Sequence, residues 1–284
     1  MNRLQLKNSN PAHNMRNQII SVLSGKGGVG KSVFVYNLAD SLAQIGKNVL
    51  IIDADVNFGN QHVLANLNVD YGFAQYAKSQ LSLKEATVQV SQNLSMLASV
   101  NSIGLFEEID IPTIAECMNR IRRETKEYDV VLIDHSSGVN KHASVMAYAS
   151  DKVLTVLVPE LTSISDSYGL FKYLHDLNPN AECRFLVNRA TTSDEAEYIY
   201  AKLCAVAERF VESIPKYFGF ISENDDFRKA VASQQSLRNS TPDSKAVEEL
   251  NTLAHKLLGT ESVVGTINSF NRINKTTAVA DIKE

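Results

Sequence analysis

The sequence lacks the features that mark several classes of protein. It has only three cysteines, Cys117, Cys183 and Cys204, and no C-x-x-C motif. All three fall in stretches that we expect to form helix or strand, so we expect buried, reduced thiols rather than disulfides. Reduced thiols suit the cytoplasm, which is the compartment that we predict for this chain.

A long apolar run is also missing. No stretch approaches the ~18 apolar residues that a membrane-spanning helix needs, and no basic segment followed by an apolar one opens the chain. We therefore expect any contact with the cell membrane to be peripheral, at its inner face. Basic charge is not in excess either, because 28 Lys and Arg residues stand against 32 Asp and Glu residues. The net charge of −4 argues against non-specific binding of nucleic acid but does not exclude a local basic patch.

Short apolar runs that alternate with amphipathic stretches dominate what is present. Buried parallel strands appear in sequence as continuous apolar runs, and helical stretches between them form βαβ units. The 284 residues therefore predict one α/β domain with a mostly parallel open sheet and helices on both faces. We expect a helix from Lys31 towards Ile45 and strands at 18–24, 48–53, 128–134, 151–159 and 183–188.

We place the sheet domain at residues 17–259, between a flexible arm at 1–16 and a tail at 260–284. The arm is polar and contains Pro11, and Gly259 follows the last strongly helical stretch, where glycine is a common C-cap. The tail carries an apolar stripe at helical spacing, which predicts an amphipathic helix that lies on a membrane. The alternative is a tail that packs on its own domain or stays disordered. The stripe consists of Val263, Ile267, Phe270 and Ile273.

The stretch GKGGVGKS, Gly25 to Ser32, matches the phosphate-loop pattern G-x-x-x-x-G-K-[ST]. It follows an expected strand and opens an expected helix, which is the context that this pattern requires. Its glycines let backbone N–H groups converge on phosphate oxygens, and the helix N-terminus favours negative charge. We expect Lys31 to reach the β- and γ-phosphates of a nucleotide and the Ser32 hydroxyl to bind Mg²⁺. The predicted nucleotide-binding residues of the loop are Gly25, Lys26, Gly27, Gly28, Val29, Gly30, Lys31 and Ser32.

Three aspartates lie at the ends of predicted strands. Asp53 and Asp55 are two residues apart, so they project to the same side of an extended segment. Two carboxylates this close repel each other unless a cation or water separates them. We expect Asp53 in the outer shell of the metal, and we expect Asp55 to orient the attacking water. Asp134 ends the run DVVLID and is expected to hold Mg²⁺ through water, as a Walker B carboxylate does.

The second lysine of the loop needs an explanation of its own, because Lys31 is enough for the phosphates. The form G-K-G-G-x-G-K-[ST] resembles the deviant Walker A motif of the MinD/ParA family of P-loop ATPases. The resemblance extends from about Gln18 to Leu258 and implies ATP, Mg²⁺ and a homodimer that forms with ATP. In that family the extra lysine reaches the partner's nucleotide, which implies this role for Lys26. Lys26, Lys31 and Asp55 are therefore the expected catalytic residues.

Other segments carry the same resemblance. DADVNFGNQHVLANL looks like the family's first switch, and DHSSGVN looks like its second, in which Asp134 matches. FLVNRA is similar to the segment whose asparagine contacts adenine, which points to Asn188 with Arg189 beside it. Ser222 replaces the proline that the family has in its base-binding loop. His135 is unusual in the second switch, and we expect a tolerated exposed residue rather than a switch contact.

Within the family, VPELTSISDSYGLFKYL most resembles the P-E-P-T-S-I-T-D-A-Y segment of the flagellar-number regulators FlhG and FleN. This resemblance implies an ATP-hydrolysing switch that regulates the placement or number of flagella and cycles on the cytoplasmic membrane. It also implies a flagellar GTPase or a basal-body protein as partner. The arm stretch NPAHNMR keeps only the alanine and the arginine of the motif with which those relatives activate a GTPase.

Three alternatives stay open at this point. A MinD-type ATPase of the division site would use the same switch. A ParA-type DNA-partitioning ATPase, which we rank lower, needs a basic surface, and RIRRETK offers Arg120, Arg122, Arg123 and Lys126. A scaffold that binds nucleotide without hydrolysing it conflicts with the intact set of motif residues, Asp55 above all.

Overall fold

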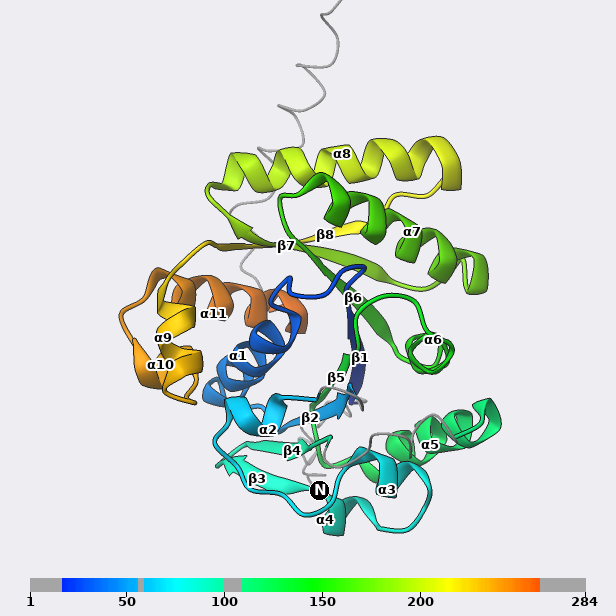
Figure 1. The fold of residues 1–284 in the computed structure, drawn as a ribbon, viewed down its shortest axis with the longest axis vertical. Coiled ribbons are helices and arrows are strands. Elements are labelled where there is room, and N and C mark those ends of the chain that lie inside the picture. The colour runs from blue at the N-terminus through cyan, green and yellow to red at the C-terminus, as the bar shows by residue number, and fades with distance from the viewer. Residues whose placement is uncertain (1–16, 56–58, 100–108, 261–284) are drawn as a thin grey trace, which may run out of the picture.

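An eight-stranded sheet forms the middle layer of the fold in a computed structural model that describes residues 17–55, 59–99 and 109–260 (Figure 1). The strands are β1 (Gln18–Leu23), β2 (Val49–Ala54), β3 (Val88–Ser91), β4 (Leu94–Leu97), β5 (Val130–His135), β6 (Lys152–Leu157), β7 (Cys183–Ala190) and β8 (Lys216–Ser222). They lie in the order β3-β4-β2-β5-β1-β6-β7-β8. Every neighbouring pair is parallel except β3 and β4, so the predicted mostly parallel sheet is confirmed.

Helices cover both faces of the sheet, as the alternation of apolar and amphipathic stretches predicts. The described helices are α1 (Lys31–Gln44), α2 (Gln61–Leu64), α3 (Phe73–Ala77), α4 (Leu83–Ala86), α5 (Ile111–Glu124), α6 (Lys141–Tyr148), α7 (Leu161–Leu177), α8 (Ser193–Val211), α9 (Asp226–Ala232), α10 (Leu237–Ser240) and α11 (Lys245–Leu258). In Figure 1, α1 and α11 lie together on one face, and α5 and α6 lie on the other.

The cores on the two faces follow from the alternation of side chains along each buried strand. In β1, Ile20 and Val22 point to the core shared with α1 and α11, whereas Ile19 points to the core beside α5. Strands buried on both faces need apolar side chains at every position, which is why these runs are continuously apolar. In β2 and β5 the first charged side chains are Asp53 and Asp134, near the carboxyl ends of the strands.

Three strands were not predicted, namely β3, β4 and β8. Each lies at or next to an edge of the sheet. β3 is partly exposed along its length, and β4 is buried but has only four residues. β8 begins with an exposed residue and carries only two fully buried positions. Short or half-exposed strands lack the continuous apolar run that identified the central ones. The five predicted strands are all confirmed.

The cysteines lie in regular structure, as predicted. Cys117 in α5 and Cys183 in β7 are buried, Cys204 in α8 is half-buried, and all three are free thiols. Burial raises the pKa of the Cys117 thiol to about 12 and that of Cys183 to about 11. Thiols with such pKa values are unreactive at neutral pH, because the thiolate is the nucleophile.

The predicted end of the last helix is confirmed as well. α11 ends at Leu258, and Gly259 caps it in the left-handed region, with φ of 69°. The arm at 1–16 and the tail from 261 onwards lie outside the described residues, so the predictions made for them stay predictions. Within the ranges that the structure covers, no helix combines the length and apolar character needed to cross a bilayer.

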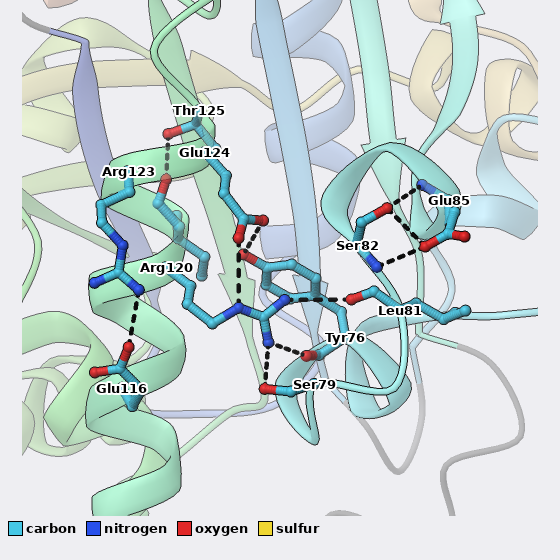
Figure 2. A network of polar contacts seen from close by, with 11 residues as sticks. Tyr76, Ser79, Leu81, Ser82, Glu85, Glu116, Arg120, Arg123, Glu124 and Thr125 are labelled. Atoms are coloured by element: carbon cyan, nitrogen blue, oxygen red, sulfur yellow. Dashed lines mark hydrogen bonds and ion pairs between the residues drawn. The ribbon is translucent and has the colours of Figure 1, made fainter.

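Most of the charge in the basic run of α5 is paired inside the molecule (Figure 2). The Arg120 guanidinium donates to the carbonyls of Tyr76 (2.9 Å) and Leu81 (3.2 Å). It also donates to the Ser79 hydroxyl (2.6 Å) and lies 4.4 Å from the centroid of the Tyr76 ring. The Tyr76 hydroxyl in turn donates to Glu124 at 3.1 Å. Arg120 therefore joins the end of α3 to α5 instead of facing solvent.

The neighbouring arginines have partners too. Arg122 donates to Asp151 (3.1 Å) and to the carbonyl of Ala149 (2.8 Å). Arg123 forms an exposed ion pair with Glu116 at 2.9 Å (Figure 2). These contacts occupy donors that DNA phosphates would need, so the three arginines provide little of the basic surface required by the ParA-type alternative.

We expect Arg120→Ala to lower the free energy of unfolding by about 2–4 kcal/mol, because it removes the donor to two partly buried carbonyls and to Glu124. Arg123→Ala, on the same helix, is the matched control and should cost less than about 1 kcal/mol, as exposed ion pairs do. Urea unfolding followed by circular dichroism measures both values. Equal effects of the two substitutions would show that the Arg120 network adds nothing beyond a surface pair.

Candidate functional site

The carboxyl ends of β1, β2, β5 and β7 lie together, and the predicted phosphate loop leaves β1 there. The loop lines a cavity of about 310 Å³, which Asp55 also lines from the end of β2. Its walls are formed by Ser24, Gly27, Gly28, Val29, Gly30, Lys31, Ser32, Val33, Asp55, Ser137 and Arg189. The structure therefore brings most of the predicted loop residues and Asp55 to one hollow.

The loop ends at the N-terminus of α1, and this helix start suits the binding of an anion. Gly30 precedes the helix with φ of 86°, and no side chain among the described residues caps the first turn. A Cβ on Gly30 would lie 2.5 Å from Nδ2 of Asn188, so only glycine fits this close approach. Backbone N–H groups at an uncapped helix start carry partial positive charge, and phosphate is a suitable acceptor for them.

Lys31 points inward from the loop to a buried pair of carboxylates. It is 7% exposed, and its ammonium donates to Oδ1 of Asp134. The register of β2 and β5 places Asp53 opposite Asp134. Asp53 is fully buried, and this burial, together with the charge of Asp134, raises the pKa of its carboxyl well above the usual range. Two buried carboxylates beside one ammonium repel each other, so the cluster favours either a proton on Asp53 or a further cation.

Lys26 lies on the outer side of the same loop. Its side chain is 41% exposed, and its ammonium donates to Oε2 of Glu160 at 2.6 Å and to the Thr162 hydroxyl at 3.3 Å. Glu160 precedes α7 and is itself 57% exposed. The two lysines of the motif therefore occupy different places, since Lys31 is buried with the carboxylates and Lys26 is at the rim.

A second cavity, of about 450 Å³, shares Gly30 and Arg189 with the phosphate cavity. Asn188, 8% exposed near the end of β7, lines it and donates from Nδ2 to the carbonyl of Val29 at 2.7 Å. The remaining wall comes from Val33, which also lines the phosphate cavity, and from Phe34, Ile221, Ser222, Glu223, Asn224, Phe227, Arg228, Val231 and Ala232. A mixed apolar and polar hollow next to a phosphate loop suits a nucleobase, so the predicted base-contact residues lie where that prediction needs them.

Ser222, at the position where the resemblance implies proline, ends β8 in the wall of this second cavity. Its N–H donates to Oε2 of Glu249 at 2.8 Å, and its hydroxyl donates to Oε1 at 2.5 Å. Proline has no N–H and could not make the first bond. The end of β8 is therefore attached to α11 through Glu249.

Sequence reasoning missed three residues of the site: Gln61, Glu160 and Ser137. Gln61 is fully buried and bonded to Asp134, Glu160 pairs with Lys26, and Ser137 lines the phosphate cavity. All three belong to segments that were recognised, namely the two switches and the start of α7. Residue type gave no signal for Gln61 and Glu160, because each contacts a partner that is distant in sequence.

His135 was predicted to be exposed, and that prediction is wrong. It is 1% exposed because β5 extends through it and turns its ring to the same buried face as Ile133. Its Nε2 lies 2.9 Å from the Ser21 hydroxyl, which lies 2.9 Å from the Ser150 hydroxyl. Burial, and next the charge of Lys31, lowers the pKa of the His135 ring to about 3. The ring is therefore neutral at pH 7.

This burial predicts acid sensitivity of the nucleotide-free protein. In the unfolded chain the His135 ring binds a proton below about pH 6.5, whereas in the folded protein it does so only below about pH 3. The contribution of this ring to the free energy of unfolding is therefore complete above pH 6.5 and is lost as the pH falls. Between pH 7 and pH 5 the free energy of unfolding should fall by about 2 kcal/mol because of this one proton. Asparagine does not titrate, so the free energy of unfolding of His135→Asn should fall less between pH 7 and pH 5. Urea unfolding in the presence of EDTA measures this free energy. An equal fall in the free energy of unfolding for the wild type and for His135→Asn would contradict this account.

The residues present suit a nucleotide with Mg²⁺. No three His, Cys, Asp or Glu side chains within the described ranges form a ready-made metal site. Mg²⁺, however, keeps several waters and takes few protein ligands. The Ser32 hydroxyl at the start of α1, with Asp53 and Asp134 buried nearby, matches that preference.

Comparison with known proteins agrees with this geometry. Residues 17–184 match a family model described as an AAA domain, which is well over half of the chain. The chain is 29% identical over 240 residues to the antiactivator FleN of Pseudomonas aeruginosa, covering 84% of this chain and 86% of that one. It is 25% identical over 245 residues to the flagellum site-determining protein YlxH of Helicobacter pylori, covering 85% and 82% of the two chains.

A solved structure shares the fold. The septum site-determining protein MinD of Pyrococcus horikoshii, complexed with Mg-ADP, superimposes with a TM-score of 0.73 at 21% identity and covers 87% of this chain and 100% of that one. The parallel sheet, the phosphate loop between β1 and α1 and the carboxylates at the strand ends agree with the family match. The chain belongs to the MinD/ParA family of P-loop ATPases, which hydrolyse ATP with Mg²⁺.

Proposed function

We propose that this ATPase is a switch that dimerises with ATP and regulates the number or placement of flagella. The observation that carries the dimer is the separation of the two loop lysines. Lys31 is buried against Asp134, whereas Lys26 lies at the rim with 41% of its side chain exposed. A lysine at the rim is available to a nucleotide held by a second copy of the chain.

The proposed chemistry divides the site residues by position. Lys31, Ser32 and the backbone N–H groups of 25–32 bind the phosphates, and the Ser32 hydroxyl, with Asp53 and Asp134 acting through water, holds Mg²⁺. Asp55, in the wall of the phosphate cavity, orients the attacking water. Lys26 of the second copy offsets the charge that develops in the transition state, as an arginine finger does.

Asn188 and Arg189, in the wall of the larger cavity, would contact the adenine end of the nucleotide. The contact between Lys26 and Glu160 then has a regulatory consequence. Within one chain Glu160 neutralises Lys26 at 2.6 Å, so Lys26 has to exchange this carboxylate for phosphate when the dimer forms. An exposed ion pair is worth only about 0–1 kcal/mol, so the exchange is inexpensive in free energy.

The flagellar role is supported by the relatives FleN and YlxH, whose names describe an antiactivator and a flagellum site-determining protein. Both comparisons span more than four fifths of each chain. A flagellar GTPase or basal-body protein is the proposed partner of the ATP-bound dimer. A MinD-type role at the division site uses the same switch and is the second candidate, supported by the likeness to MinD.

We expect Lys26→Ala to lower ATP turnover at least about 100-fold, because it removes the cation that the second chain supplies. Affinity for a fluorescent ATP analogue should stay within about threefold, since Lys31 and the loop amides are intact. Light scattering after gel filtration in ATP should detect a dimer for Asp55→Ala and a monomer once Lys26→Ala is added. Lys84→Ala, an exposed lysine on α4, is the control. A Lys26→Ala protein that turns over ATP normally would contradict the proposal.

We also propose that the dimer cycles on the cytoplasmic membrane through the tail at 260–284. Two weak amphipathic tails on one dimer bind a surface far better than one does. Full-length Asp55→Ala should therefore co-sediment with anionic liposomes in ATP but not in ADP, and a version that ends at Gly259 should not co-sediment. Binding in neither nucleotide would contradict membrane cycling and favour a protein or DNA surface as the target.

A further inference from the structure

Gln61, the first residue of α2, contacts every charged or hydroxyl-bearing residue that we assign to magnesium. Its N–H donates to Oδ2 of Asp53 at 3.1 Å. Its side-chain Nε2 donates to Oδ2 of Asp134 at 2.8 Å and to the backbone carbonyl of Ser32 at 3.0 Å. The residue is completely buried. One side chain therefore connects the segment after β2 with β5 and with the start of α1.

The orientation of the Gln61 amide is set by its partners. A carboxylate and a carbonyl are both acceptors, so the group that faces them has to be the NH₂. This assignment leaves Oε1 as an acceptor that is buried and has no hydrogen-bond donor among the described residues. A buried amide oxygen without a donor is rare in proteins and needs an explanation.

A purely structural role explains only half of these contacts. Tying α2 to α1 and β5 would need the Nε2 bonds, but it would not leave the other end of the amide unsatisfied. A side chain that only donates hydrogen bonds would make the same contacts without burying an unpaired acceptor. The unsatisfied oxygen is instead explained if the bound state brings a donor. Water held by Mg²⁺ is such a donor, and Ser32 and Asp134 already hold the other end of this amide.

We propose that Gln61 is a positioning residue for magnesium: its Nε2 holds the Asp134 carboxylate, and its Oε1 accepts a hydrogen bond from water in the Mg²⁺ shell. Lys31 donates to the other oxygen of Asp134. When Lys31 turns to phosphate, Gln61 is the contact that keeps this carboxylate oriented. The inference rests on the proposed metal role of Ser32, Asp53 and Asp134.

The test is a Mg²⁺ titration of full-length protein with a fluorescent ATP analogue. We expect Gln61→Met to raise the half-saturating Mg²⁺ concentration by about tenfold or more, the size of effect known for residues that orient metal ligands. Affinity for the analogue in EDTA should stay within about twofold. Gln89→Met, in the exposed position of β3, is the matched control and should change neither value. Gln61→Leu is the second variant and should behave as Gln61→Met does.

Melting temperature separates positioning from structural support. Without nucleotide, in EDTA, Gln61→Met should melt below the wild-type temperature, because the substitution removes the donor to the buried Asp134 carboxylate together with the unpaired oxygen. With Mg²⁺ and ADP the melting temperature of Gln61→Met should rise by less than that of the wild type. Equal weakening of nucleotide binding with and without Mg²⁺, or unchanged Mg²⁺ dependence, would overturn the inference. If nucleotide binding by the wild type did not depend on Mg²⁺, the metal assignment of Ser32, Asp53 and Asp134 would be overturned instead.

Discussion

The pairing of β2 with β5 constrains the whole site, because it buries the carboxylates of Asp53 and Asp134 next to each other. Two adjacent buried carboxylates are unfavourable unless positive charge or hydrogen-bond donors compensate them. Lys31 provides the ammonium, which is why it points inward, and Gln61 donates to both aspartates. The proposed magnesium site is therefore a consequence of the sheet register, because a divalent cation would offset the repulsion between these two carboxylates.

The inward position of Lys31 also determines what Lys26 can do. The two residues are five positions apart in one loop, yet one is 7% exposed and the other 41%. A buried lysine serves the nucleotide of its own chain, and a rim lysine can serve another. Glu160 holds Lys26 only through an exposed pair, and such pairs are weak in water. In the proposed dimer the contact between chains is therefore made at the rim, away from the buried carboxylates.

Charge elsewhere on the molecule is used mainly for internal contacts. Arg120 donates to two backbone carbonyls and lies over the Tyr76 ring, and Arg122 joins α5 to the turn that carries Asp151. A guanidinium that makes several hydrogen bonds at once supports packing in a way that lysine cannot. With these donors occupied, the described surface of α5 has little free positive charge, which agrees with a protein or membrane target better than with DNA.

The sequence by itself determined the central strands, the helix after the phosphate loop and the positions of Lys31, Ser32, Asp53 and Asp134, because local spacing and continuous apolar runs specify these features. It did not determine the edge strands, whose runs are short or half-exposed. The burial of His135 and the contacts of Gln61 and Glu160 were decided only by the tertiary structure. Their partners lie between 8 and 134 positions away in the chain, and the separations of 73 positions for Gln61 with Asp134 and 114 for His135 with Ser21 are typical. Residue type gives no information about contacts of this length, since they exist only after the sheet has brought the strand ends together.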